Sequence, residues 1–297
     1  MTRSSLAERF NIGADDITPL RQRFAQSLEA DDWAASAWQL GRLSETPSTA
    51  FFFAYQLAVR HLDPSLGADQ FAALAASESG VRHSREFTTH LSTEAPGRYR
   101  LSGEKSHIML LQRYVLDCLY VLANNEKSEL VCVRVATDAD GLTPLTATKP
   151  QPFVCDVPHA PVGFDRVLCS PADIRVDAHR RCFKPFRYWE DVMVVLSMAG
   201  WMSARTDHSS LTATVDELAA AADVLATSYR RHRNYYQPES FAYLDEVIEQ
   251  LDQQSACLND DDRRLWQRDR TLLQLGAMAR QQVRNKLLSE SLGSGGG

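Results

Sequence analysis

A glutamate at the start of an apolar run is the first residue whose position suits chemistry. Glu190 begins the stretch EDVMVVLSMAG, within a helix that the pattern predicts over residues 185–205. An apolar cavity raises the pKa of a carboxylate and strengthens it as a base, which is what abstraction of a carbon-bound proton requires. Arg187 lies three residues before Glu190 and four before Asp191, so these side chains could instead form an ion-paired corner. Both interpretations stay open.

A second candidate is SGEKSHIMLL, residues 102–111, in which a polar turn runs through a histidine into an apolar segment. The imidazole of His107 could stack on an aromatic ring. The ordinary alternative is that His107 is a half-exposed residue at the start of a strand. Lys105 would then be a simple turn residue.

The composition and charge of the chain argue against nucleic-acid binding. The chain has 297 residues, of which 44% are hydrophobic and 24% charged, with a net charge of −6. This balance predicts no nucleic-acid surface, because phosphate binding needs a basic patch. The basic run RRHR at residues 230–233 is then interpreted as the end of a helix, where cations complement the helix dipole.

The cysteines and the apolar segments predict a cytoplasmic protein with no membrane association. The six cysteines contain no C-x-x-C pair and indicate free thiols in a reducing compartment. The first residues lack an apolar signal core. The run VMVVLSMAGWM is too short to span a bilayer.

Hydrophobic periodicity changes twice along the chain. Helical spacing dominates residues 1–62, alternating strands separated by turns occupy about residues 71–176, and helical spacing returns after residue 181. Segregated blocks of this kind predict an α+β fold with a central antiparallel β domain between N-terminal helices and a C-terminal helical bundle. The expected boundaries are 1–68, 69–178 and 179–292, with a flexible tail at 293–297.

The ordered combination of motifs resembles the acyl-CoA dehydrogenase family over roughly residues 30–205. That family shows a T-E-P-x-x-G-S loop, two strands and then G-x-K-x-W-I-T. Here Ser77-Glu78-Ser79-Gly80 takes the place of the first motif, and Gly103-Glu104-Lys105-Ser106-His107-Ile108 takes the place of the second, without a gap in spacing. LSETPSTAFFFAYQLAVRHL is similar to the family helix that precedes the loop.

The resemblance implies an FAD pocket formed by the loop and the second motif, with Ser77, Gly80, His83, His107 and Met109 as the flavin contacts. Three departures predict that FAD is bound weakly or lost. Arg82-His83 replaces a Gly-Ser pair, His107 replaces the Trp, and Met109 replaces a Thr hydroxyl and cannot donate its hydrogen bond. Arg82 and Arg187 are the candidate contacts to substrate.

The same resemblance gives Glu190 its candidate role. Some members carry the catalytic glutamate ten residues before a glycine on the first helix after the β domain, and Glu190 lies ten residues before Gly200. The implied activity is oxidation or reduction of the α,β carbon bond of an acyl thioester carried by CoA or a carrier protein. The alternative is a flavin-free relative that binds an acyl thioester or serves as an assembly subunit. A homodimer or homotetramer is expected, in order to cover an apolar helix face with Phe51, Phe52 and Phe53.

Overall fold

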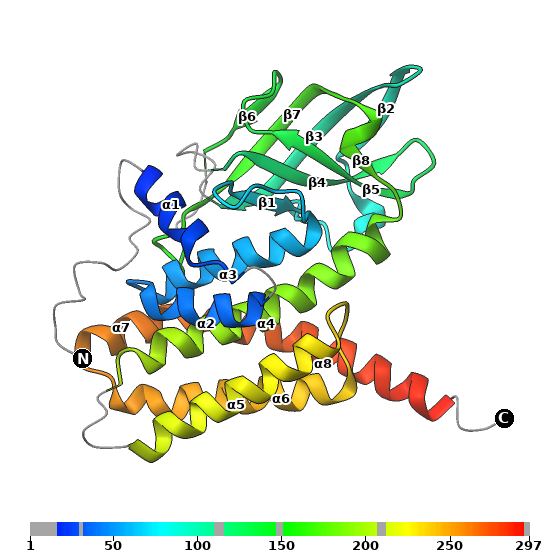
Figure 1. The fold of residues 1–297 in the computed structure, drawn as a ribbon. Helices are drawn as coiled ribbons and strands as arrows, with labels where there is room; N and C mark the ends of the chain where they lie inside the picture. Colours follow the sequence, from blue (N-terminus) through cyan, green and yellow to red (C-terminus); the bar gives the residue numbers. More distant parts are fainter. Residues whose placement is uncertain (1–16, 30–31, 110–115, 147–150, 207–211, 294–297) are drawn as a thin grey trace. The chain divides into compact units, whose positions relative to one another are not determined.

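The computed structural model describes residues 17–29, 32–109, 116–146, 151–206 and 212–293 (Figure 1). They form two compact units. The β unit contains Val59–Gln151 and Val157–Arg187, and the helical unit contains the helices up to Ala58, the segment Pro152–Asp156 and the chain from Tyr188 onward. No helix in the described ranges is long and apolar enough to cross a membrane.

Three helices precede the sheet: α1 Thr18–Gln26, α2 Trp33–Leu43 and α3 Pro47–Leu62. The Asp32 carboxylate caps α2 by accepting a hydrogen bond from the Ala35 N–H at 3.1 Å. Phe51, Phe52 and Phe53 on α3 are all buried within the chain. The expectation that these three rings need a second copy to cover them is therefore wrong, although oligomerisation itself stays a prediction.

The β unit is built on one mostly antiparallel sheet of eight strands with the order β6-β7-β3-β2-β4-β5-β8, and β1 pairs with β4 off this path. Antiparallel pairs join all neighbours except β1–β4 and β2–β4, which are parallel. The predicted central antiparallel β domain is confirmed. The strand bounds are β1 Ala72–Ala75, β2 His90–Ala95, β3 Arg98–Met109, β4 Cys118–Asn125, β5 Leu130–Ala136, β6 Leu142–Pro144, β7 His159–Cys169 and β8 Ile174–Arg175.

The chain leaves the sheet through a π-helix, His179–Phe183, that continues directly into α4 Lys184–Ser203. The remaining helices are α5 Thr212–Arg231, α6 Pro238–Gln254, α7 Asp260–Asp269 and α8 Thr271–Gly293. The sequence pattern predicts one helix over 261–291. That prediction is wrong, because the helix is interrupted at Arg270, so α7 and α8 form as two separate helices.

Two glycines allow α2 and α4 to pack closely within the helical unit. A Cβ atom on Gly200 of α4 would lie 2.1 Å from the Trp38 carbonyl oxygen, and one on Gly41 of α2 would lie 1.9 Å from the Ser197 carbonyl oxygen. Both distances are far shorter than any real contact, so only glycine permits this approach. Gly200 therefore has a packing role of its own.

Candidate functional site

The two sequence motifs lie against each other in the β unit. The loop that carries Ser77 and Glu78 follows β1, and the second motif lies within β3. The Ser106 N–H on β3 donates a hydrogen bond of 2.9 Å to the Ser77 carbonyl oxygen. The structure thus brings together the loop and the strand that the resemblance assigns to one site.

A buried ion pair fixes the loop to the strand. The Lys105 Nζ atom lies 2.8 Å from Glu78 Oε1, and the two side chains are 0% and 4% exposed. Three further donors reach the Glu78 carboxylate: the Thr88 N–H at 2.7 Å, the Thr88 hydroxyl at 2.9 Å and the Thr89 N–H at 3.1 Å. The Lys105 ammonium also lies 3.7 Å from the centre of the Phe87 ring.

This pair corrects the interpretation of Lys105 as a simple turn residue. Burial alone would raise the pKa of Glu78, but the hydrogen bonds from Lys105, Thr88 and Thr89 outweigh it and lower that pKa to about 2. Burial lowers the pKa of Lys105 to about 8, against the opposing effect of Glu78. Both groups are charged at neutral pH, and the pair holds the loop in one position.

The outer side of the loop is accessible. Gly80 has a φ of +76°, and in the described part of the chain no heavy atom beyond its two chain neighbours lies within 4 Å of the place where a Cβ would stand. Ser77, Arg82 and His83 are exposed. The loop backbone at Gly80 is therefore open to a flat ligand, and the left-handed conformation there favours glycine.

His107 and Met109 occupy different environments on β3. His107 is exposed, and its Nδ1 atom lies 2.7 Å from the Ser106 hydroxyl. Met109 is 3% exposed and pairs across the sheet with His159 of β7. The imidazole of His107 is therefore available to stack on a ring, whereas the thioether of Met109 belongs to the core.

His159 is a residue of this site that the sequence analysis does not identify. It is half-buried, and the Gln151 carboxamide oxygen accepts hydrogen bonds from its backbone N–H at 3.1 Å and its Nδ1 at 2.9 Å. Burial, with a smaller contribution from nearby His107, lowers the pKa of His159 to about 4. The ring is thus neutral and carries its proton on Nδ1, which leaves Nε2 as an acceptor. Nothing local in PHAPVGF marks this histidine, because its partners come from elsewhere in the chain.

Glu190 lies on α4 in the helical unit and is half-buried. Its neighbour Asp191 accepts hydrogen bonds from the Tyr236 hydroxyl and, at 3.2 Å, from Arg280, whose side chain is 7% exposed. Arg187 is exposed. Asp191 is therefore tied to the helical unit through Tyr236 and Arg280. The roles predicted for Glu190 and Arg187 stay predictions.

Comparison with known proteins identifies the fold. No sequence-family model matches the chain, and no curated protein matches it by sequence. Among solved structures, butyryl-CoA dehydrogenase from Megasphaera elsdenii has a TM-score of 0.64 at 11% identity, over 86% of this chain and 82% of that one. The prolyl acyl carrier protein oxidase AnaB has a TM-score of 0.61 at 14% identity, over 86% and 83%.

A third solved structure carries a reduced flavin. It is a glutaryl-CoA dehydrogenase from Mycobacterium smegmatis in complex with FADH2, with a TM-score of 0.58 at 13% identity, over 82% of this chain and 77% of that one. All three likenesses extend well beyond the segment in which the motifs were recognised. The resemblance predicted from the sequence is confirmed in three dimensions, and the chain has the acyl-CoA dehydrogenase fold.

Proposed function

We propose that the protein is a flavin-dependent oxidoreductase that acts on the α,β carbon bond of an acyl thioester. The observation that carries the proposal is the buried Glu78–Lys105 pair, which holds the loop with Gly80 against the strand with His107. The structural neighbours support the class of substrate, since two are acyl-CoA dehydrogenases and one is a carrier protein oxidase.

The residues present suit a flavin ring in part. The open backbone at Gly80 and the exposed ring of His107 offer a surface on which a flat heterocycle could lie. Met109 is buried, and its thioether cannot donate the hydrogen bond that a Thr hydroxyl would give to the flavin, a loss of about 1 kcal/mol. We therefore expect FAD to bind, but weakly enough to be lost during purification.

The roles of the side chains follow from their chemistry. FAD, when bound, would supply the acceptor for the hydride from the β-carbon of the acyl group. Glu190 removes the α-proton as the general base. Ser77, Gly80 and His83 would hold the cofactor through the loop, and His107 would stack on it. Arg82 and Arg187, both exposed cations, contact the charged part of the thioester carrier.

The test is whether the protein takes up flavin and whether an acyl thioester reduces it. FAD is titrated into the purified protein, and binding is followed at equilibrium by the quenching of flavin fluorescence. With FAD in excess, anaerobic addition of an acyl thioester such as butyryl-CoA should then bleach the flavin band. If FAD does not bind at tens of micromolar, the flavin-free alternative replaces this proposal. If FAD binds but no acyl thioester reduces it, whether carried by CoA or by a carrier protein, the assignment of substrate is wrong.

A further inference from the structure

The stretch that joins the sheet to α4 is unusually basic for this chain. Residues 179–187, HRRCFKPFR, contain three arginines and one lysine and no acidic residue, whereas the whole chain has a net charge of −6. All of these residues belong to the β unit. Such a run is ordinarily a solvated helix face, so its geometry must show whether it could instead bind a partner.

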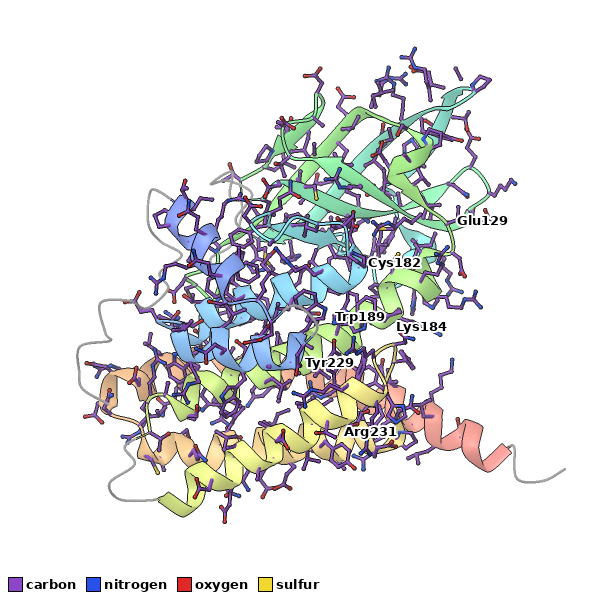
Figure 2. The ribbon with its side chains drawn as sticks, viewed as in Figure 1. Glu129, Cys182, Lys184, Trp189, Tyr229 and Arg231 are labelled. Atoms are coloured by element: carbon purple, nitrogen blue, oxygen red, sulfur yellow. The ribbon has the colours of Figure 1, made fainter. Side chains whose placement is uncertain are left out.

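Packing fixes which side of this stretch is turned outward. Ala178, Cys182 and Phe186 are buried at four-residue spacing and anchor one side of the π-helix and the first turn of α4. Cys182 and Lys184 are labelled in Figure 2 on this stretch. The basic side chains occupy the positions between these anchors and the one directly after Phe186. We call them the basic ridge: Arg180, Arg181, Lys184 and Arg187.

The ridge is accessible and only partly neutralised within the chain. The Arg180 side chain is 81% exposed and is paired with Asp177 at 2.9 Å. Arg181 is exposed and Lys184 half-buried, and in the part of the chain that the structure describes neither side chain makes a hydrogen bond or ion pair. At 1.5 Å per residue, the ridge extends for about 10 Å, or two turns. It is a short positive strip.

We propose that the basic ridge docks the acidic surface of an acyl carrier protein that delivers the thioester. This inference rests on the proposed function and chooses between its two carriers. A basic strip two helical turns long matches a partner helix that presents several carboxylates, and such pairs steer association and fix orientation. Coenzyme A offers only a few phosphates, which an exposed strip would leave solvated on most sides. A nucleic acid would need a longer basic track than this one.

The experiment measures binding, so it does not depend on flavin or on the acyl group. Fluorescently labelled holo-acyl carrier protein, with its phosphopantetheine arm but no acyl group, is titrated with the full-length protein at low and at moderate salt. Coenzyme A is the second probe. The test variant is Arg181→Glu/Lys184→Glu. The matched control is Arg98→Glu/Lys127→Glu, which makes the same change in net charge at two exposed cations elsewhere in the β unit.

The test variant should bind the carrier protein at least about tenfold more weakly than wild type, with a smaller salt dependence, while its affinity for coenzyme A changes less than about twofold. The control should match wild type on both probes. Three results would overturn the proposal. The control variant could lose as much affinity for the carrier protein as the test variant, which would mean that only net charge matters. The test variant could lose as much affinity for coenzyme A as for the carrier protein, which would make the ridge a phosphate site, or the wild type could show no salt-dependent binding to the carrier protein. Flavin reduction by butyryl-CoA is measured in parallel, so the proposed function can stand when the ridge fails.

Discussion

Removing Lys105 tests whether the buried ion pair is what holds the loop against β3. Lys105→Met keeps most of the side-chain length and removes the ammonium. The Glu78 carboxylate then retains three donors, from the Thr88 N–H and hydroxyl and from the Thr89 N–H. Removing one partner of a buried pair costs about 3–5 kcal/mol, and the surviving donors place this change near the lower end. We expect the free energy of unfolding to fall by about 3 kcal/mol.

Glu78→Gln should cost more than Lys105→Met. It leaves the Lys105 ammonium with a neutral amide and the Phe87 ring as its near neighbours. We expect a loss of about 4 kcal/mol, limited by deprotonation of a lysine whose pKa is already lowered to about 8. The double variant removes both charges together and should cost less than the sum of the single changes. The double-mutant cycle then measures the coupling between the two residues.

The pH dependence of stability gives an independent check. The pKa of Glu78 is about 2 in the folded protein, against 4.5 for an unperturbed glutamate, a difference worth on the order of 3 kcal/mol. Because the folded pKa is the lower one, this stabilisation is present above pH 4.5 and is lost as the pH falls towards 2. Urea unfolding at pH 7, 5, 4 and 3 should show that loss in wild type and a smaller one in Lys105→Met. The reasoning fails if Lys105→Met costs under 1 kcal/mol at pH 7, or if both proteins show the same dependence on pH.

Three further predictions concern other parts of the chain. Glu190→Gln should leave the fold and FAD uptake unchanged and slow flavin reduction by an acyl thioester on the order of a hundredfold, and equal rates by stopped flow would remove Glu190 as the base. Gly200→Ala places a Cβ 2.1 Å from the Trp38 carbonyl oxygen and should cost about 3 kcal/mol in thermal unfolding, whereas Gly163→Ala, whose Cβ would meet nothing closer than 3.8 Å, should cost under about 1 kcal/mol. We still expect a homodimer or homotetramer, because Leu275 and Leu288 on α8 are exposed and a second copy could cover them. Light scattering that shows a monomer at micromolar concentration would contradict this expectation.

Local rules predicted the succession of elements and one of their boundaries. The change from helical to alternating spacing placed the sheet between two helical blocks, because burial on one face imposes its period on the sequence. An asparagine directly before a helical stretch is typical of a helix cap, and the side-chain oxygen of Asn259 accepts hydrogen bonds from the N–H groups of Asp261 and Asp262 at 3.0 Å each. These features depend on residues a few positions apart.

The partners within the site could not be predicted in the same way. Glu78 and Lys105 are 27 residues apart, and each has a local sequence typical of an exposed loop or turn. Their burial depends on how the loop after β1 packs on β3. The neutral state of His159 likewise depends on burial, with a smaller contribution from His107 on another strand. The resemblance placed the two motifs in one site, and only the structure shows what joins them.

The choice of an ion pair at this place bears on function more than on stability. Two apolar side chains of similar volume would stabilise a buried contact at least as well, because desolvation of both charges offsets much of their attraction. A pair with directional hydrogen bonds does something that an apolar contact cannot. Glu78 accepts four hydrogen bonds, and together these fix the position of a loop whose outer face is exposed at Ser77 and Gly80. A precisely held and accessible backbone suits a loop that positions a ligand. We therefore expect the side chains of His107 and Met109 to set the affinity of the proposed flavin site, while the ion pair keeps its framework in place.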